Sequence, residues 1–361
     1  MTPATTNYQT NPRTETGVHE IDPLTDPRWA AFVSADPAAS VFHSAPWLEA
    51  LHRTYAYQPV AYTTAPPGRP LQDALVLCRI GSWVTGRRLV SLPFSDHCRP
   101  LARNPEDLAV LLARAQAEAD RTACRYLELR PFTAPPTDAA GLAPSASYCF
   151  HNLDLSPGLD TLFRAFHESC VQRKIRRAER EGLAYEEGQS PSLLARFYRL
   201  QVLTRRRQGL PPQPFAWFRN LAACLGPALK IRLLSRENAP IAGILTLSHN
   251  RTLVYKYGCS DARFHQLGVM PLLFWRAIQD AKAAGLLAFD LGRSDLDNEG
   301  LLHFKDRLGA ERSGLTYWRS PASPSAPAGA SWTMRAAKRV FASLPDPCRI
   351  AAGNLLYKHL G

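Results

Sequence analysis

The chain lacks several features that would set it apart from ordinary globular proteins. No apolar run approaches the roughly 20 residues of a membrane-spanning helix, and residues 1–17 contain no apolar core of a signal peptide. Its 8 cysteines are scattered without a C-x-x-C pair, which argues against a disulfide framework or a zinc site. The sequence therefore predicts a cytoplasmic protein with free thiols, no metal site and no tightly bound cofactor.

Acidic residues are also comparatively few. The chain has 31 Asp and Glu against 43 Lys and Arg, which gives a formal net charge of +12. Such an excess favours anionic partners, namely phosphate groups, nucleic acid or an acidic membrane surface.

A length of 361 residues leaves room for two domains. Helices and strands follow one another in a similar order in both halves, which predicts a mixed α/β fold of two units packed side by side. The Ala-, Pro- and Gly-rich segment Thr133–Ser147 is the expected seam between them. The predicted parts are a disordered segment 1–20, domains 21–148 and 149–319, and a linker with an amphipathic helical tail, 320–361.

The most informative stretch predicts a strand, a helix and a second strand, over Thr252–Tyr257, Pro271–Ala284 and Leu286–Leu291. Short connections make this a βαβ unit with parallel strands. Polar segments follow both strands, at Gly258–Asp261 and Gly292–Asn298. Ligands of open α/β sheets bind beyond the carboxyl ends of the strands, so we expect the main site here rather than two ordinary turns.

Three motifs in this stretch carry a resemblance: Tyr255-Lys256-Tyr257-Gly258-Cys259-Ser260, Phe289-Asp290-Leu291-Gly292-Arg293-Ser294-Asp295, and Gly300-Leu301-Leu302-His303-Phe304-Lys305. The chain resembles the FemAB-like branch of the GNAT acyltransferase superfamily, densely over residues 163–318 and more loosely over 41–132. That branch includes Fem aminoacyltransferases and BioF2-like acetyltransferases. The resemblance implies two GNAT-like domains in tandem. It also implies transfer of an acyl or aminoacyl group to an amine of a cell-envelope precursor, in peptidoglycan or surface polysaccharide.

The resemblance further implies a cleft over residues 255–260, with the donor's phosphates near the start of the helix at Pro271. The donor would be a co-substrate, either an aminoacyl-tRNA or an acyl-CoA. Of the residues before this helix only Gly268 fits the acyl-CoA pattern, and Met270 is bulky where a backbone must approach pyrophosphate. This departure favours tRNA as the acyl carrier and a small-molecule or lipid-linked anionic acceptor.

Charged side chains near the two polar segments are the catalytic candidates. We expect Arg293 to grip an anionic group and to reach toward Tyr257 and Ser260. Asp295 would orient that arginine or accept a proton from the amine; alternatively, the two pair and only brace the loop. Lys305, which matches the family's Phe-Lys element, is expected to bind a phosphate or carboxylate.

Further substrate-binding candidates lie outside these segments or on the first strand. Lys256 belongs to the first motif, and Asp96 and His97 share a proline-bracketed loop in which the imidazole could act as a general base or simply be exposed.

The most basic element is a predicted helix, Leu159–Glu181. Its Arg173, Arg176 and Arg177 oppose an apolar face, which is equally consistent with phosphate binding and with a solvated surface.

Two other functions stay open on the sequence. One is an acyl-CoA-dependent GNAT enzyme that acts on a sugar amine in exopolysaccharide assembly. The other is a non-catalytic basic protein that binds polyanions. In the tail, Thr333–Leu344 and Arg349–His359 are expected to form short helices that pack on the core or, less favourably, lie on the inner face of the membrane.

Overall fold

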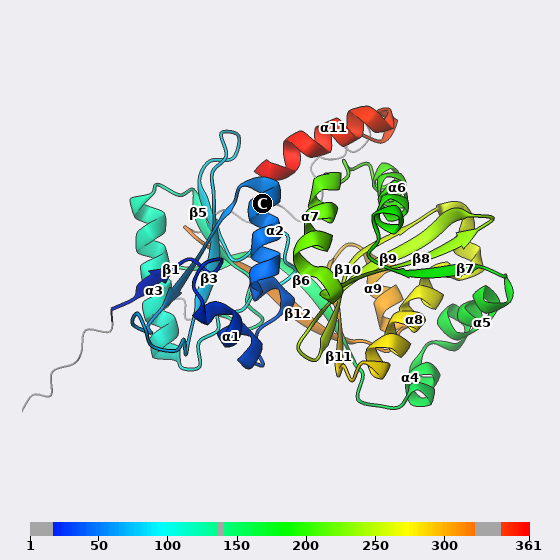
Figure 1. Cartoon of the computed structure of the whole chain (residues 1–361), viewed down its shortest axis with the longest axis horizontal. Helices are drawn as coiled ribbons and strands as arrows, with labels where there is room; N and C mark the ends of the chain where they lie inside the picture. Colours follow the sequence, from blue (N-terminus) through cyan, green and yellow to red (C-terminus); the bar gives the residue numbers. More distant parts are fainter. Residues whose placement is uncertain (1–16, 136–140, 322–340) are drawn as a thin grey trace, which may run out of the picture.

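The computed structural model describes residues 17–135, 141–321 and 341–361, and its centre is one mixed sheet (Figure 1). The twelve strands lie in the order β1-β2-β3-β4-β5-β12-β6-β11-β10-β9-β8-β7. Their bounds are β1 His19–Ile21, β2 Gln58–Thr63, β3 Leu75–Ile80, β4 Arg88–Val90, β5 Tyr126–Leu129, β6 Ala143–Asp154, β7 Ala184–Gly188, β8 Leu229–Arg236, β9 Ala239–His249, β10 Thr252–Ser260, β11 Ala288–Asp295 and β12 Glu311–Ser320.

Helices cover the faces of this sheet. The α-helices are α1 Arg28–Ala35, α2 Ala45–Tyr55, α3 Pro105–Arg121, α4 Leu159–Ala165, α5 Arg173–Arg180, α6 Pro191–Arg207, α7 Phe215–Leu225, α8 Val269–Ala283, α9 Glu299–Asp306 and α11 Asp346–Leu356. Shorter helical segments are η1 Val41–His43, η3 Glu168–Gln172, η4 Gly226–Ala228, η5 Ala262–Leu267 and η6 Tyr357–His359.

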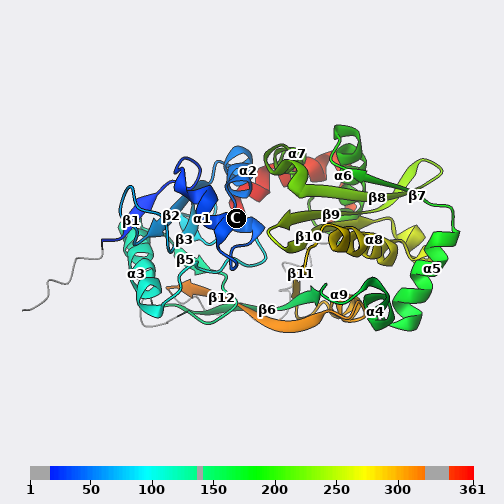
Figure 2. The same cartoon turned by 60° about the horizontal axis from the view of Figure 1, so that its bottom comes forward.

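The predicted mixed α/β class with two units in tandem is confirmed, and the two units are joined by a single sheet that runs through both halves rather than by packing alone. Strand β12 pairs with β5 of the amino-terminal half and with β6 on its other side. Figure 2 shows β6 and β12 running along the lower side of the molecule. Residues 143–147 of the expected seam belong to β6, because a partner distant in sequence turns an Ala- and Ser-rich segment into a strand. The domain boundaries stay a prediction.

Each half contains a parallel strand pair connected through a helix. Strands β4 and β5 flank α3, and β10 and β11 flank α8. The second unit is the predicted βαβ stretch, so its parallel pairing is confirmed. The repetition supports the duplicated order of elements read from the sequence.

Strands β10 and β11 separate soon after they begin. They pair only from Thr252–Val254 to Ala288–Asp290, and the ladders to their outer neighbours are irregular just beyond, between Tyr255 and Tyr257 and between Asp290 and Arg293. The two polar segments expected to be loops are largely strand. Their antiparallel partners β9 and β6 continue the pairing, while the two parallel strands splay apart from each other.

Helices α2 and α7 pack against each other where the two halves meet, with the rings of Trp47 and Trp217 5.3 Å apart. The predicted helix Arg349–His359 is present as the end of α11 and η6, and it packs on the core as expected. Tyr57 donates its hydroxyl to the carbonyl of Lys358 (3.0 Å), and Tyr357 donates to the carbonyl of Pro211 (3.3 Å). The tail thus contacts both halves. Most of the other predicted tail helix, and the segment 1–16, lie outside the described residues.

The predicted basic helix Leu159–Glu181 is instead three elements: α4, the π-helical η3, and α5. The break follows from His167, whose Nδ1 accepts the backbone N–H of Cys170 and so starts a new helix. Among the described residues, no helix has both the length and the apolar character needed to cross a bilayer.

Candidate active site

Charged side chains from both halves meet where β10 and β11 separate. Lys256 Nζ lies 3.0 Å from Asp96 Oδ2, and Arg293 Nε lies 3.9 Å from Asp96 Oδ1. Gly292, at φ +71°, allows this approach, since a Cβ there would lie 3.1 Å from Asp96 Oδ2. Burial would raise the pKa of Asp96, but the charges of Lys256 and Arg293 outweigh it and hold that pKa below its usual value.

Lys256 is enclosed by aromatic rings as well as paired. Its ammonium lies 5.3 Å from the ring centroid of Phe42, 5.9 Å from that of Trp47 and 5.7 Å from that of Tyr257. Burial lowers the pKa of Lys256, and Asp96 opposes this shift. The site therefore holds a buried cation stabilised by one carboxylate and three π faces.

His97 and Asp290 form a second buried pair beside the first. His97 Nε2 lies 2.7 Å from Asp290 Oδ2, while Asp290 Oδ1 accepts the N–H of Gly292 at 2.7 Å. Because a carboxylate only accepts, Nε2 carries the hydrogen and Nδ1 is the nitrogen left to take up a proton. Both residues line a cavity of about 370 Å³ that also includes Phe132 and Phe150.

Arg293 does not reach toward Tyr257 and Ser260 as expected. Its guanidinium lies 4.1 Å from the ring centroid of Tyr148 and 5.2 Å from that of Tyr317, and the Tyr317 hydroxyl donates to the carbonyl of Asp96 at 2.7 Å. The carboxylate beside Arg293 is that of Asp96, not of Asp295, which is exposed at the end of β11. Strand β6 supplies Tyr148 and so draws the arginine away from Ser260.

Lys305 is neither an open anion-binding group nor a surface lysine. It is 1% exposed, and its ammonium donates to the carbonyl of Gly292 (2.9 Å), the carbonyl of Arg293 (3.3 Å) and Ser294 Oγ (2.8 Å). Burial lowers its pKa to about 8. Its geometry shows that it braces the irregular part of β11, so the expected direct contact with a substrate anion is not what this structure shows.

Tyr257 and Ser260 also have partners of their own. The Tyr257 hydroxyl accepts the indole N–H of Trp217 at 2.8 Å, and Ser260 Oγ lies 2.8 Å from His265 Nε2. Tyr257 therefore packs in the core, and Ser260 belongs to a different pocket from the Asp96 cluster.

That second pocket, of about 290 Å³, lies at the start of α8. Its lining includes Lys174, Ser260, His265, Met270 and Arg307. Burial, followed by the charge of Arg207, lowers the pKa of His265, so this imidazole is neutral near pH 7. The pocket combines cationic groups with a helix amino terminus, which is an arrangement suited to phosphate.

Gly268 sits at this helix start in the left-handed region, at φ +79°. A Cβ there would lie 2.3 Å from the carbonyl oxygen of Lys174, so α5 closes tightly over the loop. Pro271 removes one further N–H from the first turn of α8. These contacts leave few free backbone donors for a pyrophosphate.

The three predicted arginines of the basic helix are exposed on α5. Arg173 pairs with Glu168 at 3.0 Å, Arg177 pairs with Glu181 at 3.2 Å, and the Arg176 guanidinium lies 5.5 Å from the ring centroid of Phe163. Their neighbour Lys174, rather than any of them, lines the pocket at α8.

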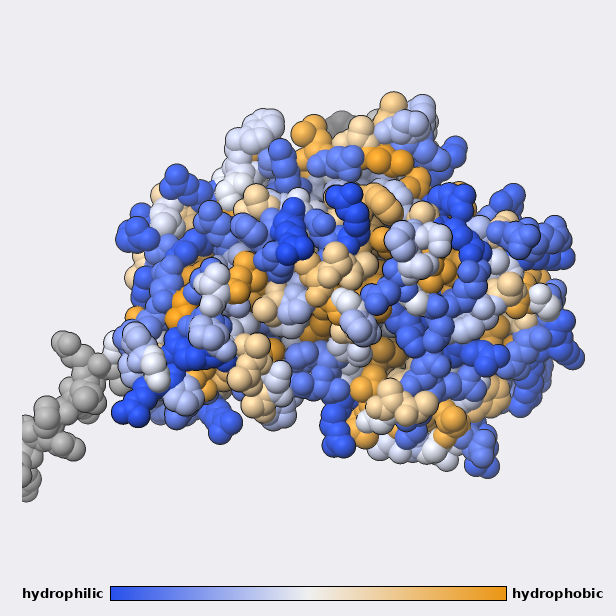
Figure 3. Space-filling model, viewed as in Figure 1, coloured by the Kyte–Doolittle hydropathy of each residue, from blue (hydrophilic) through white to orange (hydrophobic). Residues whose placement is uncertain are grey.

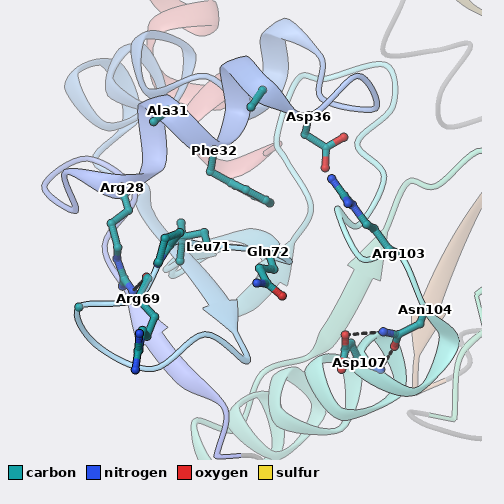
Figure 4. Close-up of a pocket in the computed structure, with 13 residues that line it drawn as sticks. Arg28, Ala31, Phe32, Asp36, Arg69, Leu71, Gln72, Arg103, Asn104 and Asp107 are labelled. Atoms are coloured by element: carbon teal, nitrogen blue, oxygen red, sulfur yellow. Dashed lines mark hydrogen bonds between the residues drawn. The ribbon is translucent and has the colours of Figure 1, made fainter.

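A further cavity, of about 690 Å³, lies in the amino-terminal half between α1 and the start of α3 (Figure 4). Some of its polar groups already have partners: Arg28 donates to the carbonyls of Pro66 and Arg69, and Asn104 donates to Asp107. None of the predicted site residues lines it. Within the described ranges, no group of three or more His, Cys, Asp or Glu could hold a metal ion.

Sequence reasoning missed Asp290 as a partner of His97, and it missed Lys174, His265 and Arg307 as pocket residues. A signal for Asp290 was present, because a lone carboxylate inside the apolar strand Phe289-Asp290-Leu291 needs a buried partner. The other three could not be found, since only the packing of α5 and α9 on α8 brings them together.

Residues 166–306 match the family model of the acetyltransferase (GNAT) domain. This stretch contains β10, α8, β11 and the pocket at the start of α8. Residues 166–306 are therefore similar to a GNAT domain. A search among curated proteins finds no match.

Solved structures of other proteins share the fold of this chain. FemX superposes with a TM-score of 0.64 at 15% identity, over 80% of this chain and 94% of FemX. A tandem GNAT protein from the clavulanic acid biosynthesis pathway superposes with a TM-score of 0.57 at 13% identity, over 86% of this chain and 100% of that protein. L-PGS from Bacillus licheniformis superposes with a TM-score of 0.52 at 16% identity, over 81% of this chain and 91% of L-PGS. The resemblance to GNAT acyltransferases is therefore confirmed over residues 166–306, where the family model supports acyl transfer as the general activity, and the FemX structure shares the fold.

Proposed function

We propose that this chain transfers an acyl or aminoacyl group to an amine of an anionic cell-envelope precursor. One observation carries the proposal: β10 and β11 splay apart between two pockets. The cavity with His97 and Asp290 lies along the first residues of both strands, and the basic pocket lies at the last residue of β10. An acceptor and a donor bound in these two pockets would meet at the splay.

In this reaction the acceptor amine attacks the donor carbonyl, a C–N bond forms, and the bond from that carbonyl to the ester oxygen or thioester sulfur breaks. The amine loses a proton to His97 Nδ1, while Asp290 holds the other ring nitrogen and stabilises the imidazolium. The imidazolium then gives this proton to the leaving oxygen or sulfur, which departs as an alcohol or thiol and leaves His97 neutral. Asp96 is a weaker base, because its pKa is held down by Lys256 and Arg293. Asp295, the proton acceptor expected from the sequence, is exposed at the end of β11 and is not part of this pair.

The donor we favour is an aminoacyl-tRNA. Support comes from the basic lining of the pocket at α8, from the exposed arginines of α5, and from the tight contact of Gly268 with Lys174. The acyl-CoA alternative is supported by the match to a GNAT acetyltransferase domain, and its acceptor would be a sugar amine.

A transfer assay separates these possibilities. The purified chain is incubated with labelled aminoacyl-tRNA or labelled acetyl-CoA, and with either a lipid-linked muropeptide or an amino sugar. We expect label in the muropeptide from aminoacyl-tRNA. Transfer from acetyl-CoA alone would establish the alternative donor. Tight binding of tRNA with no transfer in any combination would support the non-catalytic polyanion-binding function.

A further inference from the structure

The turn between β3 and β4 and the end of the tail form one projecting unit. Ser82 Oγ lies 2.8 Å from His359 Nδ1, Thr85 Oγ1 donates to the carbonyl of His359 at 3.1 Å, and Arg88 donates to the same carbonyl at 3.0 Å. The Trp83 ring lies edge-on to His359, with centroids 5.4 Å apart. In Figure 1 this turn and α11 both lie along the upper edge of the molecule.

Large apolar side chains of this unit point into solvent. Trp83 is 84% exposed, Val84 54%, Leu355 56% and Leu360 59%. Figure 3 shows hydrophobic groups interspersed with hydrophilic ones along the right part of the upper edge. Ser82 Oγ accepts the N–H groups of Val84 (3.2 Å) and Thr85 (2.9 Å), and these hydrogen bonds hold the backbone that carries Trp83.

The charge around these side chains has one sign. Neither residues 74–95 nor residues 347–361 contain an Asp or Glu. Arg87 and Lys358, which lie in the same two segments as the apolar residues, are exposed. An apolar tip with flanking cations complements a partner that has negative charge at its surface and an apolar interior beneath it.

We infer that this unit, the docking tip formed by Trp83, Val84, Leu355 and Leu360 with Arg87 and Lys358, binds the surface of an anionic lipid bilayer. Trp prefers the boundary between headgroups and acyl chains, where its ring is buried and its N–H stays hydrated. The tip protrudes, whereas the Trp anchors of protein interfaces usually fill the centre of a packed patch. The interaction is independent of the proposed reaction, and it would bring the chain to a lipid-linked acceptor.

Vesicle flotation of the full chain tests this inference. We expect wild type to float with vesicles that contain phosphatidylglycerol and to float less as salt is raised. The double variant Trp83→Ser/Leu360→Ser should lose about tenfold or more in partitioning, because two apolar side chains no longer enter the bilayer. Arg87→Gln/Lys358→Gln should lose binding to anionic vesicles. Leu159→Ser, on α4 at the opposite edge of Figure 1, is the matched control and should float as wild type does.

A second measurement does not depend on destabilising variants. Brominated lipids should quench part of the tryptophan fluorescence of wild type, and Trp83→Phe should lose that part while still floating. Failure of wild type to bind any vesicle, or equal binding of wild type and the double variant, would overturn the inference. A dimer that Trp83→Ser abolishes, with no vesicle binding, would show that a second copy of the chain covers the tip instead.

Discussion

The two parallel strand pairs of the sheet share a plan but differ at their helix starts. In the amino-terminal half, α3 begins with Asn104, which accepts the N–H of Asp107, and its first turn holds Glu106 and Asp107. In the carboxyl-terminal half, α8 has no acidic residue in its first turn and lies beside Lys174 and Arg307. An acidic first turn repels anions, so only the second unit is suited to a phosphate-bearing donor.

The segments that follow the first parallel strand of each unit, β4 and β10, also differ. The chain beyond β4 crosses to the other half, where Asp96 meets Lys256 and His97 meets Asp290. The chain beyond β10 stays in its own unit and leads directly to α8. The comparison indicates that one unit has the pocket that we propose for the donor, while the other supplies polar groups to its neighbour's splayed strands.

The largest expected effect tests what the amino-terminal unit supplies. His97→Gln keeps a hydrogen-bond donor for Asp290 but removes the proton acceptor, so we expect turnover to fall on the order of 100- to 10,000-fold with folding retained. Steady-state kinetics in the transfer assay measure this loss. Unchanged turnover would remove His97 from the proposed chemistry.

Arg293→Lys tests whether the Arg293 guanidinium binds an anionic group where β10 and β11 separate. A lysine cannot stack on Tyr148 or form a two-pronged bond, so we expect about a 100-fold loss of kcat/KM. If the arginine only braces β11, thermal unfolding will shift slightly and kcat/KM will stay near that of wild type.

Lys305→Met tests whether Lys305 stabilises β11, because its effect on the unfolding free energy should depend on pH. The folded-state pKa of Lys305 is lowered to about 8 from 10.5, so the unfolded state binds more protons between these values. Wild type should therefore gain stability relative to Lys305→Met as pH rises from 8 toward 10.5, by at most about 3 kcal/mol. Denaturant unfolding of both proteins at several pH values measures the difference. A difference that does not change with pH would show that the ammonium is not desolvated.

Gly268→Ala tests the closure of α5 over the start of α8, and Gly285→Ala at the other end of this helix is its control. Both glycines have positive φ, but a Cβ at Gly285 meets nothing within 4 Å. We expect Gly268→Ala to cost about 2 kcal/mol more in unfolding free energy than Gly285→Ala. Equal costs would mean that only backbone conformation, and not the contact with Lys174, constrains this loop.

The smallest effect is expected in the amino-terminal unit. Asn104→Ala removes the side chain that caps α3 and should lower the unfolding free energy by about 1 kcal/mol. Because this helix start is not a donor pocket in our comparison, turnover should be unchanged. A loss of donor affinity in Asn104→Ala would show that both units bind ligand.

By itself, the sequence determined the features that depend on neighbours along the chain. The alternation of strands with an amphipathic helix identified the unit β10-α8-β11, whose parallel strand pairing the structure confirms. The basic charge and the motifs up to Lys305 were enough to indicate the GNAT domain and its general chemistry.

Only the tertiary structure decided which polar groups meet. Arg293 was expected to reach toward Tyr257 and Ser260, yet strand β6, far earlier in the chain, provides Tyr148, on which it stacks, and the loop at Asp96 provides its carboxylate. Lys305 was expected to be open to substrate, yet α9 directs it into the backbone of β11. Pairing between segments so far apart depends on register and packing across the whole sheet, and these leave no periodic trace in the local sequence.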